Sequence, residues 1–551
     1  MISRFINFLK IFRRSKKGMI GLGIITAFCI VAVAAPWMTP YTDLGEDPNR
    51  EFLPLADVMS APTWLRYLPK WLGGKPDLTE TISVIQKPGC PKLYPDGELF
   101  ATGDLEKVKI FASSQNFPGS SEGSLAVSFH RKPGEGSAVT VVIYKQIYFP
   151  FTGPPGRFTG TIMLLVNGTT REKEDRLDIP LNITLFIASS EGKEWKVFPP
   201  PGKELIGSTW LPMPIPSGFS HGPGKTVIID KPLSGPFEGW ISTVGVSENK
   251  TYSYFIDSQS HYMERIRRID YEILAGKMTN IIFSKNPGNY TFGVRITFMN
   301  TTNLAEESQT TVYIDEFGFI LWGNAFGLLG TDHRGRDLFS QLVYGTRVSL
   351  YVGLLVAVLS VVIGLTVGLF SGYKGGIIDE VVMRFNDFLM VIPGLPLLMV
   401  LVVIFGTSVE ILILLLGLLG WMGFARLVRS QTLSLKERPF IEAVKAVGGG
   451  TGYIILRHLI PNVMPLVYVS LATSVPGAVL AEASLSWLGF FDPKRMSWGR
   501  MLYNFTSYAG AKTNWWWILP PGLSIALMAI SFIMLGYALD EVLNPRLRIR
   551  R

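Results

Sequence analysis

The chain has few cysteines. Its 551 residues include two, Cys29 and Cys90. Cys29 lies inside an apolar run, so a disulfide between them is not expected, and two cysteines provide no metal-binding framework. We therefore expect no metal site in this chain.

A nucleotide-binding loop is also lacking. Residues 218–226 contain Gly-Pro-Gly-Lys-Thr, but the spacing differs by one residue from that of a phosphate-binding loop. Pro223 also removes a backbone N–H that would contact phosphate. No other stretch contains a Walker motif, so we expect no ATP hydrolysis, no catalytic residue and no cofactor bound by this chain.

The positive charge of the chain lacks the pattern of a nucleic-acid interface. The net charge is +9, yet no basic patch is interleaved with aromatic residues. The basic residues instead lie beside apolar runs, which is typical of anchoring at the inner face of a membrane. We expect membrane lipid as a partner and no nucleic acid.

Long apolar runs are plentiful, and 48% of the residues are hydrophobic. The first run, at about 19–35, follows a basic N-terminus without acidic residues. Its length favours a retained membrane span over a cleaved signal peptide, although Ala-Val-Ala-Ala at 32–35 provides a cleavage site. Five further runs are each near the length of roughly 20 residues that crosses a bilayer. They lie at about 350–370, 388–403, 411–427, 463–485 and 516–538.

The region from 41 to 325 has a different texture. Short runs rich in β-branched and aromatic residues alternate with turn residues, which predicts an antiparallel sandwich or barrel. Strands are expected at 139–149, 160–166, 177–187, 226–229, 240–246, 291–298 and 310–320, with one helix at 260–276. The expected parts are therefore an N-terminal segment with the first span (1–40), a β-rich insert (41–325) and a five-helix core (326–551).

Charge asymmetry predicts the orientation of these parts. Basic residues concentrate in the 426–461 loop and the C-terminal tail, which places both termini in the cytoplasm and residues 40–325 outside the plasma membrane. Asn-X-Ser/Thr sequons all fall in segments that this topology places outside, which makes them candidate glycosylation sites. The alternative is that the sequons arise by chance, because Asn and Thr are frequent in β-rich loops. The sequons are at Asn167, Asn182, Asn249, Asn289, Asn300 and Asn504.

Several motifs outside the insert carry a family resemblance. Residues 329–350 read LGTDHRGRDLFSQLVYGTRVSL, residues 420–426 read GWMGFAR, and residues 441–462 read IEAVKAVGGGTGYIILRHLIPN. Together with Asp379, Asp387 and the 481–489 stretch, these resemble the C-type permeases of dipeptide and oligopeptide ABC importers. The resemblance covers 1–40 and about 327–551. It does not cover the β insert, which is much larger than the outer loop usual in that family.

The resemblance implies a fold and partners. The fold would be an all-α membrane bundle of six transmembrane helices, the type I importer permease, with the β-rich, sandwich-like domain inserted outside the membrane. Half of a translocation pore would come from this chain, and the other half from a second, homologous permease. Two ATP-binding subunits would hold ATP and Mg, and an extracytoplasmic solute-binding protein would deliver the substrate. The substrate would be a peptide, with oligosaccharide and nickel as the family's other options.

The 441–462 stretch resembles the family's coupling loop, whose helix fits a groove of the ATPase. The resemblance assigns ATPase coupling to residues of this helix and of the turn that follows. The sequence is suited to that role, because a short helix stopped by consecutive glycines protrudes without continuing into the next span. The coupling candidates are Glu442, Ala443, Gly448, Arg457 and Pro461.

Three residues within the spans are candidates for the translocation path. Glu482 is ionisable, and such residues in a bilayer usually face a cavity or a partner; a structural pair is the alternative. Pro393 and Pro476 weaken helix hydrogen bonding and permit kinks.

A rival interpretation is a membrane-anchored surface protein whose β domain binds glycans or proteins. A single span would suffice for anchoring, and the coupling-like loop would then have no role. Within the importer interpretation, the insert either docks the binding protein or shields the transporter from the cell envelope, and its attachment at the pore mouth favours docking.

Overall fold

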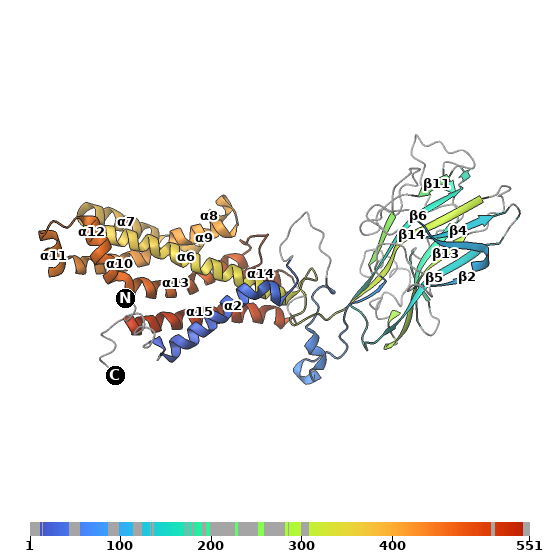
Figure 1. Ribbon diagram of the computed structural model, residues 1–551, viewed down its shortest axis with the longest axis horizontal. Coiled ribbons are helices and arrows are strands. Elements are labelled where there is room, and N and C mark those ends of the chain that lie inside the picture. The colour runs from blue at the N-terminus through green and yellow to red at the C-terminus, as the bar shows by residue number, and fades with distance from the viewer. Residues whose placement is uncertain are drawn as a thin grey trace. The chain divides into compact units, whose positions relative to one another are not determined.

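The computed structural model describes residues 12–13, 15–42, 55–85, 99–113, 124–132, 134, 137–169, 171–173, 176–178, 181–189, 194–198, 226–229, 252–257, 282–284, 286–298, 308–508 and 513–543. The chain divides into two compact units (Figure 1). We call Met1–Pro54 with Gly327–Arg551 the helical unit, and Leu55–Phe326 the β unit.

The helical unit contains long apolar helices in an order that matches the predicted runs. Its helices are α2 (Lys16–Met38), α6 (Leu338–Lys374), α7 (Gly376–Val391), α8 (Gly394–Phe405), α9 (Val409–Gly420), α10 (Met422–Lys436), α11 (Pro439–Ala446), α12 (Thr451–Ile454), α13 (Ile460–Trp487), α14 (Trp498–Ser507) and α15 (Trp515–Leu543). Among the described residues, five helical stretches are long and apolar enough to cross a membrane, and a bent pair adds a sixth if it counts as one span. The chain is therefore a multi-pass membrane protein.

The bent pair corrects the run predicted at 388–403. Instead of one short span, the structure has α7 and α8, which meet at an angle of 89°. The bend lies at Ile392 and Pro393, where Ile392 has an extended ψ of 128°. Proline has no N–H to donate and pushes the preceding residue out of the helical region, so the helix ends there. Residues 376–387, expected in a loop, belong to α7.

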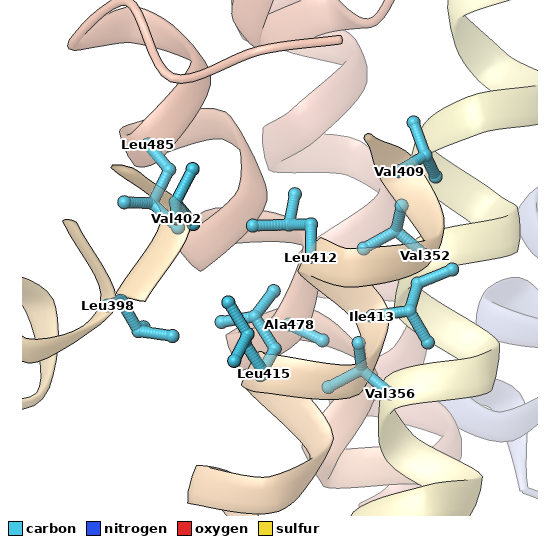
Figure 2. Close-up of a cluster of buried hydrophobic side chains, with 11 residues drawn as sticks. Val352, Val356, Leu398, Val402, Val409, Leu412, Ile413, Leu415, Ala478 and Leu485 are labelled. Carbon is cyan, nitrogen blue, oxygen red and sulfur yellow. The ribbon is translucent and has the colours of Figure 1, made fainter. Parts of the chain in front are cut away.

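A buried apolar cluster joins helices that are distant in the sequence (Figure 2). Val352 and Val356 come from α6, Leu398 and Val402 from α8, and Ala478 from α13. Leu412 and its neighbours on α9 lie between them. This packing fixes the short α8 against the long helices.

Glycines on α6 allow close contact with α10. Gly364, Gly368 and Gly372 recur every four residues, so they lie on one face of the helix. A Cβ at Gly368 would lie 2.5 Å from the carbonyl oxygen of Ala425, and one at Gly372 would lie 2.9 Å from the Cβ of Thr432. Small residues at this spacing let membrane helices approach closely.

A proline removes one backbone hydrogen bond from α2, and a side chain of α6 supplies a donor in its place. Pro36 cannot donate to the carbonyl of Ala32, four residues earlier. The Nε of Arg347 on α6 donates to that carbonyl, and its Nη2 donates to the oxygen of Val33 at 3.2 Å. An arginine in a span is thus bonded to backbone groups of its neighbour.

The charged turn before α6 is a hydrogen-bonded structure. Asp332 accepts from the backbone N–H groups of Arg334 and Arg336 at 2.8 and 2.9 Å, and from the Nε of Arg336 at 2.9 Å. The Nε2 of Gln341 donates to the same carboxylate at 2.8 Å. Asp337 caps α6 by accepting from the N–H groups of Phe339 and Ser340. The motif therefore fixes the start of α6.

Two further motif stretches meet beside this helix. The Nε1 of Trp498 donates to the carbonyl of Leu342 at 3.0 Å. A Cβ at Gly345 would lie 2.8 Å from the Trp498 ring, and one at Gly499 would lie 2.7 Å from the Cβ of Ser486. Glycine at both positions permits α14 to pack against α6 and α13.

The β unit contains two main antiparallel sheets. In the seven-stranded sheet the order is β11-β6-β14-β4-β3, with β1 beside β14 and β12 beside β6, and the five-stranded sheet has the order β10-β9-β13-β5-β2. The strands are β1 (Ile82–Ile85), β2 (Phe100–Gly103), β3 (Val108–Ser113), β4 (Ser124–Arg131), β5 (Val139–Phe149), β6 (Arg157–Thr169), β9 (Leu181–Ser189), β10 (Glu194–Phe198), β11 (Thr226–Ile229), β12 (Tyr252–Asp257), β13 (Gly288–Phe298) and β14 (Ser308–Trp322), with β7 (Arg171–Lys173) and β8 (Arg176–Asp178) as a separate pair.

Aromatic side chains connect the two sheets. The rings of Phe129 on β4 and Phe298 on β13 lie 5.2 Å apart, and those of Phe292 on β13 and Phe319 on β14 lie 5.1 Å apart. Each ring pair joins a strand of one sheet to a strand of the other, so the β unit has an apolar core of its own.

Predicted and observed strands agree closely in this unit. The runs at 139–149 and 226–229 coincide with β5 and β11, and the run at 177–187 is divided between β8 and β9. Those at 160–166, 291–298 and 310–320 lie within β6, β13 and β14. The strand expected at 240–246 and the helix expected at 260–276 lie outside the described residues.

Candidate functional site

The short helix α11 is anchored on one face and exposed on the other. Ile441 is fully buried in a cluster with Leu369 of α6 and Val428 of α10, and Val444 packs against the same cluster. Glu442 and Ala443 are exposed between them. The spacing of Ile441 and Val444, three residues apart, places both on one helix face and leaves the candidate coupling residues on the other.

The end of α11 has a defined cap. Gly448 adopts a left-handed φ of +82°. Its N–H donates to the carbonyl of Lys445 at 3.0 Å, and the N–H of Gly449 donates to that of Val444 at 2.9 Å. This pair of bonds is the Schellman motif, in which glycine avoids the Cβ penalty of the left-handed region. The glycine thus ends the helix sharply.

Basic side chains connect α11 to the end of α6. Both Lys445 and Lys436 lie over the ring of Tyr373, at 5.7 and 6.0 Å from ammonium nitrogen to ring centroid. Cation–π contacts of this kind contribute about 0.5–1 kcal/mol each at exposed sites. These contacts join α11 and α10 to the end of α6.

Of the remaining coupling candidates, Arg457 lies in a widened turn after α12, and Pro461 lies in the first turn of α13. Arg457 and Pro461 are exposed, and the turn Ile455–Leu459 is a π-helix. Pro461 has no N–H for the carbonyl of Arg457, which fits the widening at this place. His458 lies between two exposed rings, with centroids 6.3 Å from Phe440 and 5.5 Å from Tyr453. The structure therefore brings the turn alongside α11.

Two of the three path candidates lie on α13, and the third lies at the α7–α8 bend. Glu482 is 2% exposed and accepts a hydrogen bond from Ser486 at 2.7 Å, with Ser497 beside the same carboxyl. Pro476 is buried in α13, whereas Pro393 is exposed at the α7–α8 bend. These surroundings leave the path role of all three a prediction.

Two ion pairs between α7 and α10 are a feature that sequence reasoning missed. Asp379 accepts from Arg429 at 2.6 and 2.5 Å and also from the hydroxyl of Ser371. Arg426 donates to Asp387. Asp379, Asp387 and Arg426 are motif positions of the sequence analysis, which predicts no pairing for them. The sequence did contain a signal for the pairing. Asp379 and Asp387 are eight residues apart, and the two arginines are three apart, so each pair of like charges lies on one helix face.

A cavity opens beside the second of these pairs. Its volume is about 560 Å³. The lining residues are Met383, Asp387, Met390, Val391, Arg426 and Arg429.

The candidate glycosylation sites are only partly within the described residues. Asn289 is exposed on β13, and the backbones of Asn167 and Asn182 belong to β6 and β9. Asn249 and Asn300 lie outside the described residues. Asn504, in contrast, is 3% exposed within α14, so its side chain is inaccessible in this chain.

Comparison with known proteins gives two family matches, both within the helical unit. The family described as binding-protein-dependent transport system inner membrane component matches residues 364–549. The family described as N-terminal TM domain of oligopeptide transport permease C matches residues 3–54.

Individual relatives agree with these families. The dipeptide transport system permease protein DppC of Bacillus subtilis is 38% identical over 222 residues, which cover 40% of this chain and 68% of that relative. The oligopeptide transport system permease protein OppC of Haemophilus influenzae is also 38% identical over 222 residues, covering 40% of this chain and 71% of that relative. A solved chain of the inward-facing MetNI methionine ABC transporter is 21% identical, with 37% of this chain and 94% of that chain covered, and its TM-score of 0.30 is too low to bear on the fold.

Proposed function

Because the chain belongs to the inner membrane components of binding-protein-dependent transport systems, as a C-type permease of the peptide class, we propose that it forms half of the pore of an ATP-driven peptide importer. The observation that carries the mechanism is α11, whose buried face is fixed to α6 and α10 while Glu442 and Ala443 are exposed. As a transport subunit it leaves ATP hydrolysis to its partners.

The proposed assembly contains this chain, a second homologous permease, two ATP-binding subunits that hold ATP and Mg, and an extracytoplasmic solute-binding protein. Closure of the ATPases would push on α11 and, through its packing with Leu369 and Val428, on α6 and α10. The translocation cavity between the two permeases would then switch from inward- to outward-facing. It would receive the solute from the docked binding protein. Peptide is the proposed substrate, and the family's oligosaccharide and nickel importers remain the alternatives.

The proposed topology has six spans, with α7 and α8 together as one broken span. Both termini and α11 would be cytoplasmic, which agrees with the basic residues around α11. The β unit would lie outside the membrane as a sandwich, with the Phe129–Phe298 and Phe292–Phe319 contacts between its layers. It would dock the binding protein.

The proposed coupling site can be tested by affinity purification of the tagged chain in mild detergent. The test variant carries Glu442→Arg and Gly448→Asp, which reverses an exposed charge and strains the left-handed cap. We expect the wild-type chain to recover two ATPases and a second permease, and the variant to recover the permease without the ATPases.

The β unit provides a matched control, Glu106→Arg with Gly134→Asp. Glu106 is exposed, and Gly134 has a φ of +83° with open space around it, so the chemical changes are the same. Equal loss of the ATPases in the control would show a general loss of folding rather than a coupling site. Recovery of the wild-type chain with no ATPase would contradict the proposed function.

A further inference from the structure

We propose that the cavity between α7 and α10 is a solute-binding site within the transport path, in which Asp387 holds the ammonium group and Arg426 the carboxylate of a zwitterionic peptide. The inference rests on the proposed function, because it needs the pore that the function supplies. The residues that line the cavity and form its ion pair all belong to this chain.

The two ion pairs between α7 and α10 differ in exposure. Arg429 and Asp379 are 32% and 12% exposed, and Asp379 is held by two guanidinium nitrogens and a serine hydroxyl. Arg426 and Asp387 are 50% and 51% exposed. The first pair therefore fastens the helices together, whereas both charges of the second pair are open to the cavity.

Arg426 lies at the inner end of the apolar run 411–427, and an open pair of charges there needs a polar environment. Charged side chains at membrane depth are costly toward lipid and usually face a water-filled cavity or a partner. Arg426 lies in the candidate span Val409–Lys436, and Asp387 in the bent pair. The cavity supplies such a place, because it contains both charges and the side chain of Arg429.

The strength of the exposed pair suits exchange with a solute. Water screens a half-exposed ion pair, which therefore contributes little, so a solute with one charge of each sign can replace it at little cost. Transport also requires binding that is weak enough for release. The replacement preserves the charge balance, since each side chain exchanges one partner for another of the same sign.

The walls of the cavity fit peptides of varied sequence. Met383, Met390 and Val391 form the apolar part, and methionine adapts to irregular shapes. A volume of about 560 Å³ lies within the range of small-molecule sites. The peptide termini would thus be recognised by charge, and the side chains tolerated.

The test measures cysteine modification in the complete importer, reconstituted in lipid nanodiscs. Cys29→Ser and Cys90→Ser remove the native thiols, and Met390→Cys places a new one in the cavity wall. A water-soluble cationic thiosulfonate is the reagent, and trialanine is the probe. N-acetyl-trialanine amide, which has similar bulk and no charge, is the control peptide.

We expect trialanine to slow modification of Cys at 390 and the blocked peptide to leave it unchanged. Arg426→Gln should weaken this protection at least about tenfold in trialanine concentration, as expected for the loss of one charged hydrogen bond. Val403→Cys is the matched site, because Val403 is exposed on α8 and absent from the cavity lining. Its modification should not respond to trialanine.

Three outcomes would overturn the inference. Absence of modification at 390 would mean that lipid or the second permease covers the cavity. Equal protection by both peptides would mean apolar occupancy only. Protection that survives Arg426→Gln would exclude carboxylate recognition. Failure of the proposed function is a separate result, namely no ATP-dependent uptake by the wild-type importer, and the thiol measurement needs no ATP.

Discussion

At the scale of single residues, Arg347 stabilises a proline-containing membrane helix by supplying the missing donor. Its guanidinium bonds the carbonyls of Ala32 and Val33, and the first of these has no N–H partner because residue 36 is proline. An unsatisfied carbonyl in an apolar environment costs free energy comparable to a lost hydrogen bond. Arg347 therefore offsets the free-energy cost of the hydrogen bond that Pro36 cannot make.

A double-mutant cycle tests this coupling. Arg347→Ala should lower the free energy of unfolding by about 1–2 kcal/mol, the upper end of the values for hydrogen bonds in membranes. Pro36→Ala restores an N–H for Ala32, so the same arginine substitution should then cost clearly less. Thermal midpoints in detergent measure all four chains. Equal costs in both backgrounds would show that Arg347 acts independently of Pro36.

Asp337 gives a prediction about pH, because it caps α6 from a buried position. Burial, partly offset by hydrogen bonds from Ser340 and Phe339, raises the pKa of this carboxyl above its ordinary value of 3.8. The folded chain therefore binds a proton more readily than the unfolded chain, and stability should fall as pH rises through the raised pKa. Asp337→Asn keeps the cap without the charge.

The measurement is the thermal midpoint of wild type relative to Asp337→Asn as a function of pH. The wild-type chain should lose stability relative to the variant as the pH rises from about 4. Asp337→Ala, which lacks the cap, should be less stable than the Asn variant by about 1 kcal/mol. A difference between wild type and Asp337→Asn that does not change with pH would contradict the pKa shift.

At the scale of elements, close packing of α6 on α10 depends on its glycine stripe. Gly368→Ala would place a Cβ 2.5 Å from the backbone oxygen of Ala425, which side-chain rotation cannot relieve. We expect a loss of about 1–3 kcal/mol, the usual cost of overpacking, measured as a lower thermal midpoint. Gly423→Ala on α10 is the control, because nothing lies within 4 Å of its Cβ position. An unchanged midpoint for Gly368→Ala would mean that the helices are not closely packed.

The sequence predicted elements better than their junctions. The strand predicted at 139–149 has the same bounds as β5, because its residues alternate and one face is buried. Pro393 was predicted to permit a kink within one span, but the division of that span into two helices at 89° was not predicted, because the apolar composition continues from α7 into α8. Hydropathy records the length of a run, whereas the direction of a helix depends on backbone dihedrals and packing.

The candidate site shows the same limit. The position of α11 and its glycine end follow from local sequence, since Gly448 and Gly449 satisfy a cap that involves the preceding turn alone. The Asp387–Arg426 pair joins residues 39 apart, so its partners could not be chosen without the packing of α7 on α10. Likewise, the partners of Glu482 come partly from Ser497, beyond the end of its own helix.

At the scale of the whole molecule, the β unit is attached through two neighbouring strands of chain. The N–H of Ala61 donates to the carbonyl of Asn324 at 2.8 Å, and the N–H of Phe326 donates back to Ala61 at 2.8 Å. The chain therefore enters and leaves this unit at one place. Insertions with adjacent ends are tolerated by the host domain, so we predict that the helical unit folds without the β unit.

Replacement of residues 57–325 by a short Gly-Ser linker tests the role of the β unit. The helical unit should still insert and keep its thermal midpoint, because its glycine stripe, caps and apolar clusters lie in other residues. If the β unit docks the solute-binding protein, affinity for that protein in nanodiscs should fall at least about tenfold, the loss of one well-made contact. A longer linker is the control for strain at the junction. Unchanged uptake and unchanged binding-protein affinity would exclude docking and leave shielding from the cell envelope as the role of the β unit.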